Sequence, residues 1–508
     1  MFAPSIYRKG NSGRAAGLLL LLFFMVACAP LKAQTGLRWV RQLGGGFDFT
    51  RPLGPGPDAD NCISRKGCSV ATDDQNNIYV AGFYADSTDF GNGVWQIPPG
   101  NHKNVLFLAK YDSTGQLLFL KNFYGTGNAA TPSGHRFENM FLQTDPDGNV
   151  YLIAWMQGGQ ADLDPGPGTF TGQYGRYYLI KLSPAGNFVK AIQVPGAFPG
   201  VSYAAVAAQH YKLIGRHYYV RDEYRIYRYS LNLDLELTID VRSSSGLEYN
   251  EFNSCLITSY DVDGEGRIYC SVSTTGAIGC TMTNSKSFML KYSASGTRIW
   301  NKPFPGGTLS LYKNRIRTGG YLPANYSLDA DPGPDSFIVS GSPGHPGYMA
   351  DFDTSGRFVL ARNQSLFTSG KNYGRSGHFK AASIAGTLSP GDLNTTNDTL
   401  RYRYEDQSGA GSFLARGMND FVVVRTDDYE NLVSLLHFGG VGSEVVGDWT
   451  MDRSGNMIVL GTFSHADDCD YDPGPDIVRL RNPAMTADPV FFNYVSTSIF
   501  LLKLNMNP

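Results

Sequence analysis

The chain carries the phrase Phe107-Leu-Ala-Lys-Tyr-Asp-Ser-Thr-Gly115-Gln-Leu-Leu-Phe119 and repeats it three times further along. The other copies begin at Tyr178, Phe288 and Tyr348, and each has a Gly eight residues after its aromatic start. Aromatic and β-branched residues favour strands, and the Gly-containing centre favours a turn. A phrase that returns at a regular spacing indicates a repeat architecture, so each copy is expected to form the last two strands of one repeating unit.

A second phrase precedes the first in the best-preserved units. Asp73-Asp-Gln-Asn-Asn77 leads into a β-rich run, and the same order returns at Asp145-Pro-Asp-Gly-Asn149 and Asp452-Arg-Ser-Gly-Asn456. A turn of Asp, Asn and Gly between two β-rich runs predicts a hairpin. Two hairpins give four antiparallel strands per unit. Several strands are apolar on both faces, as expected when each small sheet packs between two neighbours.

The number of units follows from the residue after the third-strand lysine or its equivalent, which recurs about every 65 residues. Seven such positions occur: Tyr111, Leu182, Tyr229, Tyr292, Phe352, Thr426 and Leu504. The fold class predicted from them is all-β, a seven-bladed β-propeller with four antiparallel strands per blade. The third unit, residues 201–241, lacks the Asp-Gly-Asn turn, and the fifth and sixth units also depart from the pattern in their first hairpin.

The two ends of the chain predict how the ring closes. The last unit stops at Ile499-Phe-Leu-Leu-Lys-Leu504 and a short tail, without a fourth strand. Gly36-Leu-Arg-Trp-Val resembles the fourth-strand phrase Gly296-Thr-Arg-Ile-Trp. The N-terminal strand is therefore expected to complete the last blade and cover its edge. On this reading residues 34–508 form one propeller domain.

The combined phrases resemble a bacterial β-propeller repeat family often called SBBP. The likeness rests on Asp-x-x-Gly-Asn-x-Tyr, Asp-Phe-Gly and Phe-x-x-Lys-Tyr-Asp-x-x-Gly followed by Trp, and it is strongest in the first, second, fourth and seventh units. The resemblance implies an exported propeller. It implies no catalytic residues, because the family has no agreed enzymatic activity.

Residues 1–33 are predicted to be a signal peptide. Basic residues precede the apolar run Gly17–Val26, which as a helix is too short to cross a bilayer. Leu31-Lys-Ala33 fits a peptidase site, whereas Met25-Val-Ala-Cys28 resembles a lipobox that would leave a lipid anchor on Cys28. Both alternatives predict export, to the outside, the outer cell surface or the periplasm.

Charge and cysteine content exclude two classes of partner. The net charge is −2, with no basic run beyond the N-terminus, so nucleic acid is not an expected ligand. No Cys or His spacing matches a zinc finger. Outside the cytoplasm cysteines can pair, and Cys62 and Cys68 are close enough in sequence to close a short loop.

An acidic loop recurs between strands and supplies the candidate site. Asp-Pro-Gly-Pro follows an Asp-x in all three copies and suits a tight turn. The same carboxylates could instead bind calcium, a hard cation that takes oxygen ligands. The candidate ligands are Asp162 and Asp164, then Asp329, Asp331 and Asp335, and finally Asp470, Asp472 and Asp476.

No catalytic motif stands out among the eight histidines or elsewhere. The Tyr cluster from Tyr218 to Tyr229 is interpreted as core packing, with a sugar-stacking platform as the alternative. The predicted function is a non-enzymatic exported scaffold that binds a glycan or a protein through its loops. The alternative is a propeller-fold carbohydrate-active enzyme, a glycoside hydrolase or lyase, which would need two carboxylates facing each other across the centre.

Overall fold

The computed structural model describes most of the repeating units. The described residues are 36–43, 68–84, 88–96, 105–124, 136–157, 160–195, 210–246, 253–278, 281–322, 325–341, 347–364, 379–385, 399–403, 410–414, 419–427, 432–440, 444–463, 469–474, 476–480 and 498–506. Strands dominate them, and the helix α4 spans only Val241–Ser244.

The strands form antiparallel sheets that follow the chain order, numbered I to VII here. Sheet I contains β2 (Ser69–Thr72), β3 (Ile78–Tyr84), β6 (Val105–Tyr111) and β7 (Leu117–Phe123). Sheet II contains β8 (Arg136–Thr144), β9 (Val150–Gln157), β12 (Tyr177–Leu182) and β13 (Phe188–Val194). Sheet III contains β14 (Tyr211–Ile214), β15 (His217–Arg221), β16 (Arg225–Ser230) and β17 (Leu235–Asp240).

The later units repeat this order. Sheet IV contains β18 (Asn253–Val262), β19 (Ile268–Ile278), β20 (Thr281–Tyr292) and β21 (Arg298–Pro303). Sheet V contains β22 (Thr308–Tyr312), β23 (Arg315–Tyr321), β26 (Gly347–Asp353) and β27 (Phe358–Gln364). Within the described residues sheet VI has three strands, β28 (Phe379–Ala385), β31 (Asn419–Thr426) and β32 (Leu432–Phe438).

Sheet VII joins the two ends of the chain. It contains β33 (Glu444–Met451), β34 (Asn456–Phe463), β35 (Ser498–Asn505) and, as its fourth strand, β1 (Gly36–Leu43). β1 pairs antiparallel with β35 from Gly36 opposite Asn505 to Leu43 opposite Ile499. The pairing covers the edge of β35 that the C-terminal strand would otherwise expose.

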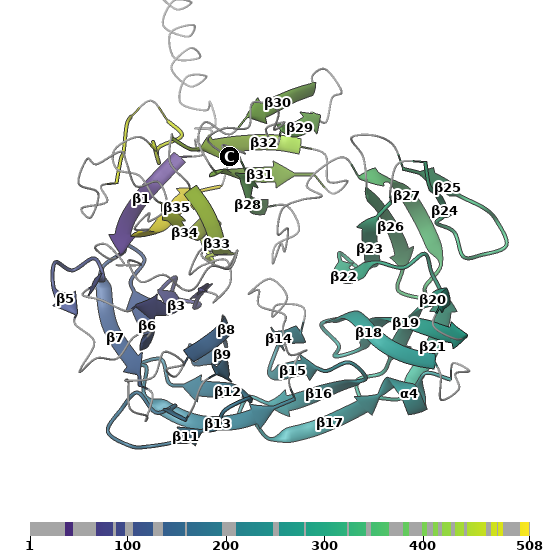
Figure 1. Ribbon diagram of the computed structural model, residues 1–508, viewed down its shortest axis with the longest axis horizontal. Helices are drawn as coiled ribbons and strands as arrows, with labels where there is room; N and C mark the ends of the chain where they lie inside the picture. The colour runs from purple at the N-terminus through teal and green to yellow at the C-terminus, as the bar shows by residue number, and fades with distance from the viewer. Residues whose placement is uncertain are drawn as a thin grey trace, which may run out of the picture.

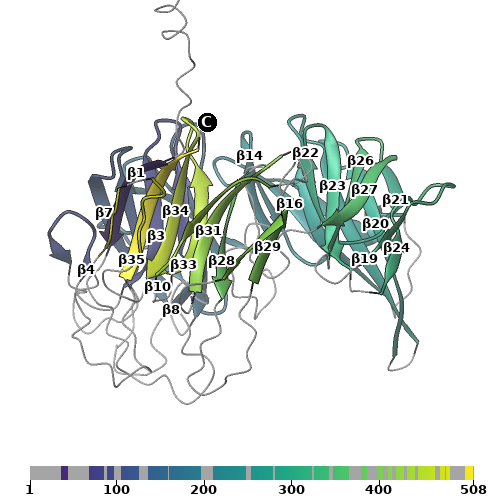
Figure 2. The ribbon, with the colours of Figure 1, turned by 90° about the horizontal axis from the view of Figure 1, so that it is seen from above.

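Figure 1 shows the seven sheets set around a common centre, as in a β-propeller, with first strands such as β14 and β22 innermost and β7, β17 and β21 on the outside. Figure 2 shows that the strands run between two faces, and that the β19–β20 hairpin projects beyond the other sheets. Since the strands alternate in direction, the tight first-to-second and third-to-fourth turns share one face, here called the turn face. The second-to-third connections leave the opposite face, here called the ribbon face.

Short two-stranded ribbons occupy four of the second-to-third connections. They are β4 (Thr88–Asp89) with β5 (Trp95–Gln96), β10 (Ala161–Asp162) with β11 (Thr171–Gly172), β24 (Ser327–Asp329) with β25 (Ile338–Ser340), and β29 (Thr399–Arg403) with β30 (Ala410–Leu414). The last ribbon lies between β28 and β31, so β28 corresponds to a second strand.

Apolar layers between consecutive sheets hold the assembly together. In β3, Tyr79, Ala81 and Phe83 face sheet II, whereas Ile78, Val80 and Tyr84 face sheet VII. This alternation explains why the strands are apolar on both faces. Six clusters join I to II, II to III, III to IV, IV to V, VI to VII and VII to I.

All seven positions used to count the units lie in third strands, at the same structural irregularity. Each follows or borders a β-bulge toward the fourth strand, as between Lys110 and Tyr111 or between Lys291 and Tyr292. A bulge beside a turn with a Gly at positive φ increases local twist and ends the pairing in a fixed register. The repeated phrase therefore encodes a bulged hairpin.

Deleting residues 36–45 should lower the melting temperature and produce oligomers, because it exposes the edge of β35 and removes Leu43 from the layer between sheets VII and I. Thermal unfolding and size-exclusion chromatography of the deleted and intact mature chains measure this. An unchanged melting temperature with monomeric elution would contradict the role given to β1.

Candidate functional site: turn face and ribbon face

On the turn face, a basic side chain from the third strand of one sheet donates to a turn carbonyl of the next. Lys110 Nζ lies 3.2 Å from Pro184 O, and Lys181 Nζ lies 2.8 Å from Leu231 O. Equivalent bonds join Arg228 Nη1 to Ala294 O at 2.7 Å, Lys291 Nζ to Thr354 O at 2.9 Å and Lys503 Nζ to Ser113 O at 3.1 Å. The acceptor is always the second residue of the turn before the fourth strand.

These lysines are almost buried, so their charge needs local stabilisation. Lys110 is 9% exposed, and its Nζ lies 4.8 Å from the centre of the Tyr79 ring and 3.5 Å from Asp73 Oδ2. The Tyr79 hydroxyl donates to the same carboxylate oxygen, which fixes the ring under the ammonium group. Burial lowers the pKa of the equivalent Lys291. A charge-assisted hydrogen bond and a cation–π contact offset the cost of desolvation.

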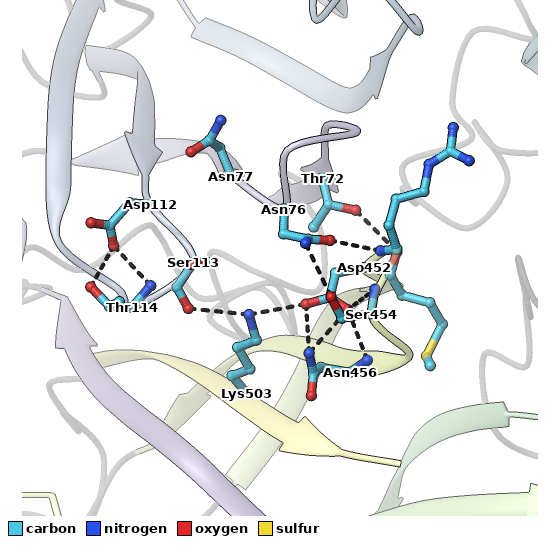
Figure 3. A network of polar contacts seen from close by, with 12 residues as sticks. Thr72, Asn76, Asn77, Asp112, Ser113, Thr114, Asp452, Ser454, Asn456 and Lys503 are labelled. Carbon is cyan, nitrogen blue, oxygen red and sulfur yellow. Dashed lines mark hydrogen bonds and ion pairs between the residues drawn. The ribbon is translucent and has the colours of Figure 1, made fainter. Parts of the chain in front are cut away.

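The two chain ends meet in such a network (Figure 3). Lys503 Nζ lies 2.9 Å from Asp452 Oδ2 and donates to the carbonyl of Ser113, a residue 390 positions away in the sequence. Trp39 of β1 donates its indole N–H to the same carbonyl at 3.1 Å. Strands from both ends of the chain thus converge on one turn of sheet I.

Turn glycines admit an aromatic side chain from the preceding sheet. Gly115 has φ +82° and Gly356 has φ +78°, in the region that favours glycine. A Cβ on Gly115 would lie 3.3 Å from the Trp39 ring, and one on Gly356 would lie 3.2 Å from the Trp300 ring. The turn Gly of one sheet therefore lies against the fourth-strand Trp of the preceding sheet.

Near the centre, side chains of first strands accept hydrogen bonds from the next first strand. Asp448 Oδ2 accepts from Val70 N at 3.0 Å and from the Ser69 hydroxyl at 2.7 Å. Ser69 Oγ accepts in turn from Leu142 N at 3.0 Å. In sheet IV, Asp261 contacts Lys212 at 2.9 Å and accepts from Leu311 N at 2.8 Å. The inward carboxylates Asp448 and Asp261 are thus engaged in holding neighbouring sheets together.

The ribbon face carries the three Asp-Pro-Gly-Pro loops, which share one hydrogen-bond pattern. In the first, Asp162 Oδ1 accepts from Asp164 N and Phe170 N, and Asp164 Oδ1 accepts from Gly166 N. Asp329 and Asp331 make the equivalent bonds in sheet V, and Asp470 and Asp472 make them in sheet VII. Asp335 and Asp476 are exposed at the loop ends. The eight aspartates therefore form three separate loops.

Each loop packs on strands of its own sheet, and in the first loop Asp162 N also donates to Tyr124 O at the end of the preceding sheet. In each loop the residue after the first Asp is buried. Its backbone N–H donates to the carbonyl of the residue seven positions further on, as Leu163 N donates to Phe170 O. The ring of Phe170 lies 5.5 Å from Phe188 of β13, and that of Phe337 lies 5.4 Å from Phe358 of β27. Hydrogen bonds from Phe337 N and Ser336 hold the pKa of Asp329 below its usual value. These contacts account for the motif as a rigid clip.

Calcium binding by these loops stays a prediction. Among the described residues, no group of three or more His, Cys, Asp or Glu is arranged to hold a metal ion. In each loop the Oδ1 atoms of the first two aspartates already accept backbone N–H groups. The second carboxylate oxygens and the terminal Asp of two loops are the groups that an ion would use.

Exposed aromatic side chains accompany the ribbons. Trp95 is 52% exposed on β5, Tyr174 is 64% exposed just before β12, and Tyr326 is 66% exposed before β24. Ile338 and Ile477 add exposed aliphatic surface in sheets V and VII. No sequence motif marks these exposed aromatic residues, because the exposure of an aromatic side chain in a strand depends on which neighbouring element covers it.

Most of the Tyr cluster and the four described cysteines are buried. Tyr218, Tyr219 and Tyr229 are buried, which confirms core packing for these three, whereas Tyr224 and Tyr227 are partly exposed. Cys255 and Cys270 are buried and not joined by a disulfide. Cys62 lies outside the described residues, so the Cys62–Cys68 pairing stays a prediction.

Histidines are divided between interior and surface. His210 is 2% exposed and lies 3.2 Å from Arg221, which itself donates to Ile257 O and Thr258 O of sheet IV. Burial, with the charge of Arg221 beside it, lowers the pKa of His210 to about 3. His217 is partly exposed and lies 3.3 Å from Glu236.

The predicted signal peptide and Cys28 also lie outside the described residues. In the part of the chain that is described, no helix is long and apolar enough to cross a membrane.

Comparison with known proteins gives likeness of fold only. No protein family and no curated protein matches the chain. Among solved structures, polysaccharide lyase Uly1 is 10% identical with a TM-score of 0.41, covering 92% of this chain and 99% of its own. The Pan2 WD40 domain of Neurospora crassa is 8% identical with a TM-score of 0.33, covering 92% and 97%. The phage phi92 endosialidase is 6% identical with a TM-score of 0.34, covering 92% and 69%.

Substitutions at Asp470 separate the clip from a calcium site. Asp470→Asn keeps an oxygen that accepts the two backbone N–H groups, whereas Asp470→Ala leaves them without it and should cost about 1–2 kcal/mol of unfolding free energy. The clip alone predicts that Asp470→Asn melts close to the unaltered protein. Thermal melts in EDTA and in millimolar calcium provide the second measurement. If calcium raises the melting temperature of the unaltered protein but not that of either variant, the ion site is established.

His210 should make the protein sensitive to mild acid. Because its folded pKa lies below its unfolded pKa of about 6.5, the unfolded state binds more protons between these values. The stability contribution is complete above pH 6.5 and falls as the pH drops, by roughly 3 kcal/mol at pH 4. Between pH 7 and pH 4, the melting temperature of His210→Asn should fall less steeply with pH than that of the unaltered protein. His217→Asn is the matched control. An equal dependence of melting temperature on pH in all three proteins would contradict this assignment.

Proposed function

We propose that the seven sheets form a closed seven-bladed β-propeller whose ring is completed by β1. Six apolar layers between consecutive sheets and the convergence of Trp39 and Lys503 on Ser113 support this proposal. Within that ring, the chain acts as an exported binding scaffold whose ligand is a glycan bound on the ribbon face. The leader-like residues 1–33 support export, with the lipid anchor at Cys28 as the alternative to free secretion.

The binding proposal depends on a difference between the two faces in what their recurring side chains contact. The recurring polar groups of the turn face and the inner edge bind neighbouring sheets. The ribbons instead expose aromatic side chains on hydrogen-bonded turns. Around Trp95, for example, Asp89 Oδ1 accepts from the backbone N–H groups of Gly91, Asn92 and Gly93. A loop ordered in advance loses little conformational entropy on binding.

Flat aromatic faces beside polar groups suit sugars. The C–H groups of a pyranose ring pack on Trp or Tyr, and the oxygens of surrounding amides and carboxylates accept hydrogen bonds from its hydroxyl groups. Gln96 follows Trp95 directly, and Gln173 precedes Tyr174. The exposed aromatics differ from sheet to sheet, as expected of recognition residues placed on a repeated scaffold.

A glycan array followed by titration calorimetry tests the proposal. Trp95→Ala and Tyr174→Ala should each weaken binding of a glycan found on the array by about tenfold, which is about 1.4 kcal/mol. Leu118→Ala is the matched control, because Leu118 is as exposed as Trp95, at 52%, but lies on the outer strand β7. Equal loss in the control, or binding to proteins alone, would contradict glycan recognition by the ribbons.

The carbohydrate-active enzyme is the alternative outcome of the same assay. Cleavage of a polysaccharide, abolished by substitution of one carboxylate near the centre, would replace the scaffold proposal. Asp448 and Asp261 are the variants to include, with melting curves beside activity, because both residues also hold neighbouring sheets together.

A further inference from the structure

The turn between β4 and β5 contains the only Asn-Gly pair in the sequence, Asn92-Gly93. Both residues are exposed, and Figures 1 and 2 place this ribbon at the outside of the molecule. Gly93 has φ +74°, and a Cβ built on it would have no atom within 4 Å. The backbone nitrogen that follows the Asn92 side chain is therefore shielded neither by a side chain of its own nor by a neighbouring element.

An asparagine side chain can lose its amide group when the next backbone nitrogen attacks its Cγ. This reaction requires the two atoms to be held near each other. It also requires an acceptor for the proton on the attacking nitrogen. A hydrogen-bond donor on the amide oxygen, where negative charge develops, lowers the barrier further.

The turn supplies all three requirements. Val94 N donates to Asn92 Oδ1 at 3.0 Å, and the ring closed by this bond includes both Asn92 Cγ and Gly93 N. The side chain is therefore folded along the backbone toward the attacking nitrogen, with a donor on its oxygen. Gly93 N donates to Asp89 Oδ1 at 3.0 Å. An ionised carboxylate only accepts, so Asp89 is placed to take the proton of that nitrogen.

Other hydrogen bonds hold this arrangement in place. Asp89 Oδ1 also accepts from Gly91 N at 2.9 Å and from Asn92 N at 3.1 Å. Asn187 offers a comparison, because it is exposed and follows a turn glycine as well. It precedes the bulky Phe188, and its Oδ1 accepts from Lys121 Nζ at 3.4 Å. The set of groups around Asn92 is thus more than exposure in a turn.

We infer that Asn92 deamidates in the folded protein, with Gly93 N as the nucleophile and Asp89 as the proton acceptor. The lone pair of Gly93 N forms a bond to Asn92 Cγ, its proton passes to Asp89 Oδ1, and the carbonyl electron pair moves to Asn92 Oδ1 beside the Val94 N–H. When that pair returns, the Cγ–Nδ2 bond breaks, and Nδ2 takes the proton from Asp89 and leaves as ammonia. Water then opens the resulting succinimide at either carbonyl, which gives aspartate or isoaspartate.

The modification changes the charge and the backbone of the ribbon. Either product places a second carboxylate in the turn that Asp89 already occupies, and like charges repel. Isoaspartate also adds a methylene group to the backbone, which disturbs the pairing of Asp89 with Trp95. Since Trp95 is a residue of the proposed glycan site, the modified protein should bind glycan more weakly. This consequence alone rests on the proposed function.

Peptide mapping of the folded mature chain by mass spectrometry, during incubation at neutral pH, tests the modification. The peptide with Asn92 should gain the mass of OH replacing NH₂, and should accept a methyl group from isoaspartyl methyltransferase, at least about tenfold faster than the peptide with Asn187. The same chain unfolded in urea shows what the turn contributes. Asn92 that stays intact in the folded protein but reacts in urea would overturn the inference, because the turn would then protect it.

A conservative variant tests the role of Asp89. Asp89→Asn keeps an oxygen for the turn N–H groups but is a much weaker base, so it should slow the reaction of Asn92 at least about tenfold. Asp112→Asn is the matched control, because Asp112 accepts from Thr114 N and Gln116 N in another turn of sheet I. Hydrogen exchange of residues 88–96 establishes that the turn is kept. Equal rates in both variants and the unaltered protein would refute the assignment to Asp89.

Glycan titration of fresh and incubated protein tests the consequence. The incubated form should bind about tenfold more weakly, as expected for Trp95→Ala. Equal affinity of the two forms would contradict the effect on the ribbon. If neither form binds a glycan, the proposed function fails, whereas the mass spectra still decide whether Asn92 is modified.

Discussion

The structure depends on a nearly buried cation that leaves its own sheet to bind the next. An ammonium group with so little exposure is costly unless its surroundings supply negative potential. The turn carbonyl of the following sheet, the face of a tyrosine and the Asp of the first hairpin supply it together. Since the partner belongs to the next unit, a sheet on its own cannot satisfy the charge. The contact therefore links these sheets to their neighbours at five junctions.

The other recurring residues of the phrase serve the same contact. The turn Gly takes a positive φ and leaves room for the aromatic side chain from the preceding fourth strand, and the bulge beside it sets the register. Apolar residues alternate between the two layers on either side of each strand. The repeated phrase therefore encodes one interface between sheets. One unit supplies the lysine and the fourth-strand aromatic residue, and the next unit supplies the turn. In sheet V the lysine and tyrosine positions are taken by Asp351 and Arg317, which bind each other within the sheet.

The faces of the assembly differ because this interface occupies one of them. Polar groups of the turn face and inner edge are used for cohesion, which explains why the inward Asp448 and Asp261 bond to neighbouring strands. On the ribbon face, the Asp-Pro-Gly-Pro clips tie loops to the sheets, including the preceding sheet in the case of Asp162, whose N–H donates to Tyr124 O. The ribbons there also expose aromatic side chains to solvent. If the proposed function is right, these exposed positions can vary while the contacts between sheets stay the same.

Local chemistry in the sequence was enough to predict the all-β class, the two hairpins of the best-preserved units, the third-strand positions and the pairing of Gly36–Leu43 with the last strand. Periodicity and turn residues act over a few positions, so they can be read without knowing the partners. Tertiary structure alone decided which groups far apart in the sequence meet: Lys503 with Ser113, Arg221 with the carbonyls of sheet IV, Asp448 with Val70. It also decided that Tyr218 is core and Trp95 is surface, although both are strand aromatics. Burial depends on what packs against a strand, and that neighbour is placed by the assembly of sheets rather than by the strand's own residues.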